Sequence, residues 1–203
     1  MFKKLAVVTM LSLGIGIFSG CGNEKPPAKS AADMPKSNIV TPGKVDITFN
    51  YGKQQGMSSN QFAVWIEDAN GKYIKTLGVT KFVATKGYKT REQALVNWVK
   101  KAQRADLTDK QVEAITTATP STGKQKYEWD CTDAKGNPVV AGEYSYVVEA
   151  TRYMEDYDLF SGKILVGSKT VTSKAAIKVF GDAEKNKNMI TDVSAEFIPH
   201  TNI

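Results

Sequence analysis

The alternation of apolar and polar residues predicts a β-strand that begins soon after residue 42. In the segment KVDITFNY, every second side chain is apolar, which is the period of a strand with one buried face. The apolar face consists of Val45, Ile47, Phe49 and Tyr51. The segment KQQGMSSN that follows breaks the alternation with Gly and Ser and so separates this strand from the next.

A hairpin is predicted from the next two alternating segments, QFAVWIED and KYIKTLGVT, which flank the sequence DANG at 68–71. Asn and Gly both tolerate positive φ, so this pair between two apolar runs is a strong hairpin signal. Phe62, Val64 and Ile66 share one face, whereas Trp65 lies on the other. We therefore expect one of two arrangements: helices cover Trp65, or Trp65 is exposed as a contact for a partner or ligand.

The period of the pattern then changes to that of a helix, in TREQALVNWVKKAQ. Its apolar stripe is formed by Ala94, Leu95, Trp98, Val99 and Ala102. Thr90 with Gln93, and Thr108 with Gln111, have the spacing of capping boxes, which predicts a second helix from 108 to about 118. We interpret residues 90–118 as a helical insertion over one edge or end of the sheets.

Strand patterns resume in YEWDCTDAKGNPVVAGEYSYVVEA. One face carries Tyr127, Trp129 and Cys131, and the turn DAKGNP leads to a second strand. The inward face of that strand is formed by Tyr144, Tyr146, Val148 and Ala150, while Val147 interrupts the polar outer face. Tyr144, two residues after Gly142, is a candidate tyrosine-corner residue. We expect Cys131 to be a buried hydrophobe rather than a reactive thiol, because no His or basic cluster adjoins it in the sequence.

Further strands are expected in ILVGSKTVTSKAAIKVFG and in MITDVSAEFIPH, and the polar segment TRYMEDYDLFSGK, which precedes both, is expected to be a connection. Repeated alternation between turn signals is typical of two packed sheets. Residues 43–203 are therefore predicted to form a mainly-β domain. The specific prediction is an immunoglobulin-like β-sandwich of about seven to eight strands with a short helical insertion.

The N-terminus has the layout of an export signal. Lys3 and Lys4 precede an apolar run, and the segment FSGC follows it, which predicts a signal peptide over 1–21. The apolar run is shorter than the roughly 20 residues of a membrane span. FSGC resembles the cleavage box of bacterial lipoproteins, with Phe18 in place of the usual Leu, so we expect Cys21 to be lipidated. The alternatives are an ordinary signal peptide with a chance Cys and an uncleaved anchor.

Residues 22–42 predict a flexible linker, because they are rich in Pro, Lys, Ala and Ser and nearly lack large apolar residues. Gly22 after the cysteine favours the outer membrane over the inner one, if the cell has two membranes. The sequence thus predicts a lipid anchor that holds the domain at the periplasmic face of a bacterial envelope.

Charge excludes one class of function. The chain has a formal net charge of +6, and removal of Lys3 and Lys4 leaves +4. The basic residues are scattered among acidic ones without a basic stripe, so we expect a solvated surface and no nucleic-acid binding.

Candidate sites are few. The loop TPSTG contributes Thr119, Ser121 and Thr122 as possible partner or ligand contacts, although it lacks the spacing of a phosphate-binding loop and also fits a simple connector. His200 is the only histidine and lies near the C-terminus, so neither nucleophile–His catalysis nor a zinc site is expected. We predict no catalytic residue, no metal and no cofactor.

Two acidic features are candidate sites. Glu155, Asp156 and Asp158 are the densest acidic group, and we expect a solvated loop there rather than a calcium site, because the spacing of a calcium loop is missing. Glu149 beside Arg152 is expected to form an ordinary surface ion pair.

Two resemblances rest on these segments. WDCTDAKGNPVVAGEYSYVVEA, from 129 to 150, is expected to form a hairpin that resembles the immunoglobulin-like module of the flagellar hook-capping protein, with its Trp-Asp strand, turn and Gly-x-Tyr strand. More of the chain is similar to an uncharacterised family of predicted periplasmic proteins, a domain of unknown function. The matching features are SNQFAVWIEDANGKYIKTLGVTKF, a central helix with Trp98, ATPSTG, and the segment ending in EATR. This resemblance implies an exported domain of unknown activity, associated with envelope systems for flavin transfer and for haem or iron.

The sequence therefore favours a non-catalytic envelope lipoprotein that binds or assembles with another envelope protein, since exposed strand edges suit recognition by strand addition. The alternative is an accessory protein for envelope flavin, haem or metal handling, with a small-ligand pocket between helix and sheet. A hydrolase is the third and least supported possibility.

Overall fold

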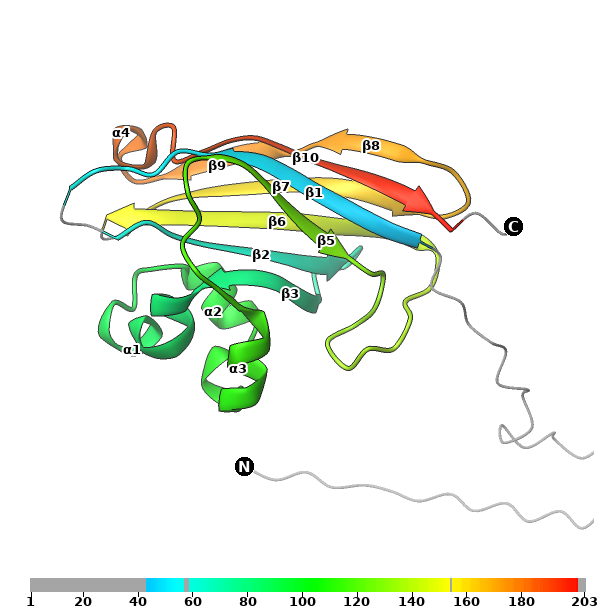
Figure 1. Cartoon of the computed structure of the whole chain (residues 1–203), viewed down its shortest axis with the longest axis horizontal. Helices are drawn as coiled ribbons and strands as arrows, with labels where there is room; N and C mark the ends of the chain where they lie inside the picture. Colours follow the sequence, from blue (N-terminus) through cyan, green and yellow to red (C-terminus); the bar gives the residue numbers. More distant parts are fainter. Residues whose placement is uncertain (1–42, 57–58, 154, 201–203) are drawn as a thin grey trace, which may run out of the picture. The chain divides into compact units, whose positions relative to one another are not determined.

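The computed structural model describes residues 43–56, 59–153 and 155–200, which form two β-sheets and a layer of short helices (Figure 1). The predicted signal peptide, Cys21 and linker lie outside the described residues. One sheet has four strands in the order β5-β1-β10-β8, and the other has six in the order β4-β3-β2-β6-β7-β9. The described part is thus a mainly-β sandwich, as predicted, with ten strands rather than seven or eight.

The four-stranded sheet is built around β1 (Gly43–Tyr51), whose predicted alternation is confirmed. β1 pairs antiparallel with β10 (Ile190–Pro199) on one side and β5 (Gly123–Trp129) on the other. Its apolar side chains point into the sandwich and are at most 1% exposed. β8 (Val171–Lys174) completes this sheet beside β10.

The six-stranded sheet contains the predicted hairpin of β2 (Gln61–Asp68) and β3 (Tyr73–Thr80). Asp68 Oδ1 accepts hydrogen bonds from the backbone N–H of Asn70 and Lys72, both at 2.9 Å. Of the predicted Asn-Gly pair only Gly71 has positive φ, at 75°. The turn is therefore longer than a two-residue hairpin loop, because the Asp68 side chain organises it.

The six-stranded sheet continues through β6 (Gly142–Tyr153), β7 (Asp156–Val166) and β9 (Ala176–Phe180). The expected polar connection over 151–163 is wrong, because β6 ends at Tyr153 and β7 begins at Asp156. The expected strand in 164–181 is divided at Ala175, so that β8 and β9 belong to different sheets. At the opposite edge, β4 (Thr116–Thr117) is a two-residue strand parallel to β3.

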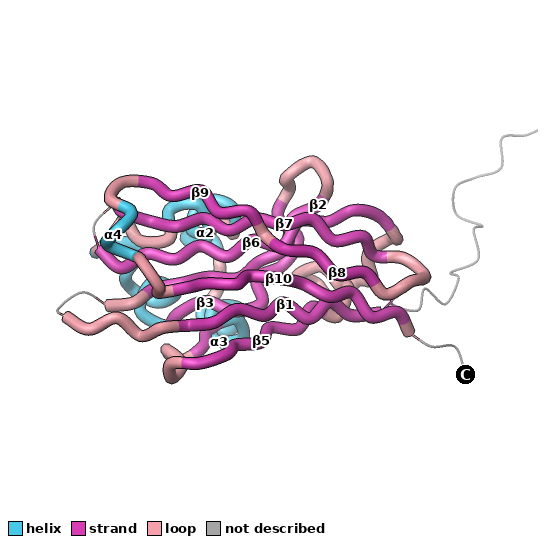
Figure 2. Tube along the Cα trace, turned by 90° about the horizontal axis from the view of Figure 1, so that it is seen from above, coloured by secondary structure: helices cyan, strands magenta, loops and turns pink. Residues whose placement is uncertain are grey.

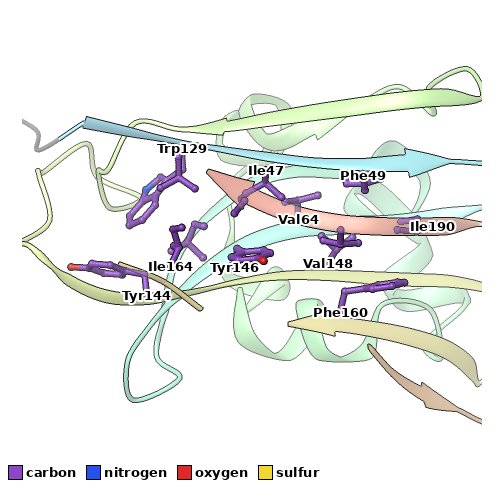
Figure 3. Close-up of a cluster of buried hydrophobic side chains, with 14 of the residues drawn as sticks. Ile47, Phe49, Val64, Trp129, Tyr144, Tyr146, Val148, Phe160, Ile164 and Ile190 are labelled. Atoms are coloured by element: carbon purple, nitrogen blue, oxygen red, sulfur yellow. The ribbon is translucent and has the colours of Figure 1, made fainter. Parts of the chain in front are cut away.

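The interior of the sandwich is filled by side chains from both sheets (Figure 3). Trp129 of one sheet and Tyr144 of the other have ring centroids 5.0 Å apart. The turn between β5 and β6 predicts a hairpin, but this prediction is wrong, because the two strands belong to different sheets. They lie in opposite sheets, because their large inward side chains have to meet across the gap.

The predicted tyrosine corner is confirmed, since the Tyr144 hydroxyl donates a hydrogen bond of 2.8 Å to the carbonyl oxygen of Val140. The strand order, however, departs from that of immunoglobulin constant domains, in which the first strand pairs with the second. Here β1 pairs with β5 and β10, and β2 belongs to the other sheet.

The helices cover the outer face of β2, β3 and β6 (Figure 1). They comprise a π-helical turn (Val83–Gly87), α1 (Tyr88–Thr90), α2 (Val96–Lys101), a 3-10 turn (Arg104–Asp106) and α3 (Asp109–Ile115). A sixth short segment, α4 (Ala183–Asn186), precedes β10 at one end of the sandwich. The helical insertion is therefore present, but it begins before residue 90 and forms a third layer on the face of the six-stranded sheet, not over an edge or end as expected.

One of the two predicted capping boxes forms. At α3, the Thr108 side chain accepts from the Gln111 N–H and the Gln111 side chain accepts from the Thr108 N–H. The box at Thr90 does not form, because Thr90 is the last residue of α1 and Arg91 leaves the helical region with φ −141°. The predicted long first helix is thus divided, although its stripe residues Ala94, Leu95 and Trp98 are fully buried.

Candidate functional site

β9 forms an open edge of the six-stranded sheet. It pairs with β7 on one side, and no other strand in the described part of the chain pairs with it. All five of its residues are exposed, among them Ile177 at 50%, Val179 at 44% and Phe180 at 38%. Figure 2 shows β9 along one border of the molecule. An unpaired apolar edge is a template for another strand.

The side chains of β9 alternate between the two faces of the sheet. Ile177 is paired with Phe160, which belongs to the core of the sandwich, so it extends the apolar inner face beyond the last covered strand. Lys178 is paired with Leu159 on the helical side. Lys178 forms no ion pair with any described residue. The edge is thus apolar with uncompensated positive charge.

Trp65, the aromatic residue singled out from the sequence, is covered by the helices and is 1% exposed. Its indole Nε1 donates a hydrogen bond of 2.8 Å to Glu67 Oε1, and Lys101 Nζ lies 3.1 Å from the same carboxylate oxygen. Of the two expected arrangements, the covered one is therefore observed. Trp65 ties the helical layer to the sheet and is not available at the surface.

The TPSTG loop lies between β4 and β5, and Thr119, Ser121 and Thr122 are all exposed. The Thr122 hydroxyl oxygen accepts a hydrogen bond of 3.0 Å from the backbone N–H of Lys53. Thr119 lines a polar hollow together with residues of the β1–β2 loop, among them Asn60. The structure brings this loop next to the β1–β2 loop, an arrangement that no local sequence pattern indicated.

Glu149 is fully buried on the helical side of β6, so the expected surface pair with Arg152 is wrong. Its Oε2 accepts from the Trp98 N–H at 2.9 Å, and its Oε1 accepts from the N–H and side-chain amide of Asn97 at 3.2 and 3.1 Å. These bonds cap the N-terminus of α2. Burial raises the pKa of this carboxyl, and the bonds from Trp98 and Asn97 oppose that rise.

The sequence contained an indirect signal for Glu149. Val147 interrupts the polar outer face of the same strand, and Trp65 lies on the outer face of the neighbouring one. Two large apolar side chains on one face indicate that it is covered, so a carboxylate on the same face, two residues from Val147, has to meet hydrogen-bond donors.

The acidic group at 155–158 is not a solvated loop. Glu155 is exposed, but Asp158 lies within β7 and is 5% exposed, and burial raises the pKa of its carboxyl. Asp156 Oδ1 accepts a hydrogen bond of 2.8 Å from the Asp182 N–H. Within the described residues, no group of three or more His, Cys, Asp or Glu side chains is arranged to hold a metal ion.

Cys131 is buried in the sandwich core, as predicted, and burial together with the neighbouring Asp130 raises the pKa of its thiol to about 12. At such a pKa the thiolate is scarce near neutral pH.

A cavity of about 300 Å³ lies between α3 and β3. Leu77, Leu107 and Ile115 supply apolar walls, and Tyr73 and Lys75 supply polar groups. The Tyr73 hydroxyl is 2.8 Å from Thr76 Oγ1, which also accepts from the Trp98 indole at 2.9 Å. This cavity has the location, between helix and sheet, of the small-ligand pocket considered from the sequence.

None of the helices in the described residues is both long and apolar enough to span a membrane.

The comparisons with known proteins identify a family but no close relative of established function. Neither the curated proteins nor the solved structures include a match to this chain. The resemblance to the flagellar hook-capping protein is unsupported, and its two strands lie in different sheets here. Residues 43–184, however, match the family described as predicted periplasmic protein (DUF2271). Since this match covers more than half of the sequence and most of the sandwich, the chain belongs to the DUF2271 family of predicted periplasmic proteins.

Proposed function

We propose that this protein is a lipid-anchored, non-catalytic binding module of the bacterial envelope, which holds a protein partner by adding a strand to β9. The observation that carries the proposal is the open edge described above, where five consecutive residues are exposed in a paired strand. Natural sheets usually protect such edges with charge, proline or a covering element. Here Lys178 supplies the one charge within β9.

The inner face of β9 explains why a partner strand would be held. Ile177 and Val179 are about half exposed, although they continue the face that carries Phe160 in the core. A strand added beside β9 would satisfy its free backbone groups and shield these two side chains from water. Lys178, which forms no ion pair with a described residue, favours a partner segment that combines apolar with acidic residues.

Cross-linking in intact cells tests this function. The full chain, expressed with a photo-cross-linking residue in place of Ala176, is compared with the same protein carrying Val179→Lys. Leu165→Lys is the matched control, because Leu165 is 54% exposed on β7 and lies outside the edge. We expect a specific adduct that Val179→Lys abolishes and Leu165→Lys retains. Equal adducts in both variants, or none in the parent, would contradict the proposal.

The proposed anchor is tested separately. Mass spectrometry of the mature protein should show a chain that begins at Cys21 and carries lipid, and Cys21→Ser should release the protein from the membrane fraction. Density fractionation should place the parent in the outer membrane if the cell has two membranes. An intact Met1, or an unmodified mature N-terminus, would rule out lipidation.

A second candidate function is supported by the cavity between α3 and β3. The protein would then be an accessory to envelope flavin, haem or metal handling that binds a small ligand among Leu77, Leu107 and Ile115. Pockets that bind small molecules combine such apolar walls with a few polar groups, here Tyr73 and Lys75. Protein purified from its native envelope would show a flavin or haem absorbance band, or stoichiometric metal, under this candidate and none under the first.

The finer assignment of the sandwich as immunoglobulin-like is supported by the tyrosine corner of Tyr144. An experimental structure tests it, since a shared ancestry should be visible as a common arrangement of the core strands around that corner.

A further inference from the structure

Arg104 is a buried cation without a bound carboxylate. Its side chain is 5% exposed, and it forms no ion pair within the described residues. Nε donates to the carbonyl oxygen of Ala84, Nη1 lies 3.5 Å from the carbonyl oxygen of Leu107, and the guanidinium stacks on the Tyr88 ring at 4.4 Å. These contacts satisfy part of the hydrogen-bonding capacity but supply no negative charge, which buried cations normally have nearby.

One guanidinium nitrogen is left for a ligand. Nη2 makes no hydrogen bond to any described residue. It is also not one of the buried side-chain atoms that lack a partner, so it remains accessible. Arg104 lines a cavity of about 560 Å³ between α3 and the π-helical turn. The arginine is thus fixed in position by Ala84 and Tyr88 and keeps donor capacity toward an accessible space.

The cavity carries both signs of charge. Lys81 joins Arg104 on the side of the π-helical turn, and Asp109 and Glu113 line it from α3. None of these four side chains is within ion-pair distance of another. A simple anion would be attracted by the first pair but repelled by the second, whereas a molecule with both charges would be complementary to both.

We propose that this cavity binds a small zwitterion, with its oxyanion on Arg104 and Lys81 and its ammonium group on Asp109 and Glu113. Amino acids and the phosphoethanolamine headgroup both have this chemistry. The site is separate from the β9 edge, and nothing in the proposal depends on strand addition.

Calorimetric titration of the full chain in a non-ionic detergent tests the proposal. The probes are L-alanine and O-phosphoethanolamine as zwitterions, acetate and inorganic phosphate as oxyanions alone, and ethylamine as the cation alone. We expect at least one zwitterion to bind at least tenfold more tightly than the corresponding oxyanion alone and than ethylamine alone. Binding of alanine alone indicates an amino acid or peptide, and binding of phosphoethanolamine alone indicates a headgroup. Binding by neither zwitterion, or equal binding by a simple oxyanion, overturns the proposal.

Variants of exposed residues test the position of the binding site while the buried Arg104 is kept. Lys81 and Glu113 are exposed, so Lys81→Met and Glu113→Gln should leave the fold intact and should each weaken the zwitterion by about tenfold, the effect of one charge-assisted contact. Lys86→Met and Glu92→Gln are the matched controls, because both residues are exposed in the same insertion and do not line the cavity. Equal weakening by the controls would show a general charge effect and contradict the site.

Discussion

Replacement of Trp65 by Ala tests whether the helical layer is held to the sheet through this side chain. In the native protein Trp65 projects from β2 toward the helices and is 1% exposed. It contributes both apolar contact and the 2.8 Å hydrogen bond from Nε1 to Glu67. Trp65→Ala removes both, and we expect a large loss in the free energy of unfolding.

The magnitude follows from the buried area. A buried Trp removes about 150–250 Å² from water. At about 25 cal/mol per Å², this corresponds to about 4–6 kcal/mol, of which the remaining methyl group retains part. We therefore expect Trp65→Ala to cost about 3–5 kcal/mol. Trp65→Phe keeps most of the apolar area and loses the hydrogen bond, and it should cost about 1–2 kcal/mol, because Lys101 still pairs with Glu67.

Equilibrium urea unfolding, followed by circular dichroism, measures these values at one pH for the full chain. Leu165→Ala is the matched control, because this apolar residue is 54% exposed on β7, and it should cost less than about 1 kcal/mol. A cost below about 1 kcal/mol for Trp65→Ala, equal to the control, would refute the reasoning. It would place Trp65 at an accessible surface, the alternative that the sequence left open.

Three further outcomes are expected. Burial raises the pKa of Glu149 in the folded state, so the folded protein binds this proton more tightly than the unfolded chain does. The contribution of Glu149 to stability should therefore be greatest below the unfolded pKa of 4.5 and should decrease as the pH rises toward the folded pKa. Unfolding measured from pH 4 to 8 should show a smaller decrease for Glu149→Gln than for the parent protein, and parallel curves would contradict this assignment. The Cys131 thiol, with its pKa of about 12, should resist alkylation at pH 8 in the folded protein and should react in urea. Peptide mass spectrometry measures the labelling, and rapid labelling of the folded protein would show that the thiol is accessible. Tyr144→Phe should cost about 0.5–1.5 kcal/mol through loss of the bond to Val140, and an unchanged urea midpoint would mean that the corner hydrogen bond contributes nothing.

Much of the strand content could be predicted from the sequence, because the pattern of each strand is local. The alternation in β1 and the turn at Asp68 depend on side-chain positions within a few residues of one another. The same is true of the capping box of α3, in which Thr108 and Gln111 satisfy each other's backbone. Local geometry was sufficient in these cases, since the residues that determine each element are the residues within it.

The candidate sites were harder to predict from the sequence. Glu149 and Arg152 are neighbours in the chain, which suggested a pair, but their side chains project to opposite faces of β6. The buried position of Arg104 depends on Ala84 and Tyr88, which come from a separate turn of the insertion. Such sites form only when distant segments pack together.

The sequence by itself determined that the folded part of this protein is built from amphipathic strands with a helical insertion, because alternation and capping are properties of short segments. Only the tertiary structure decided which strands share a sheet. Trp129 and Tyr144 belong to opposite sheets, although a turn joins their strands, since both side chains fill the same interior. It also decided that Trp65 is covered and β9 is open, because burial depends on what the rest of the chain places against each face.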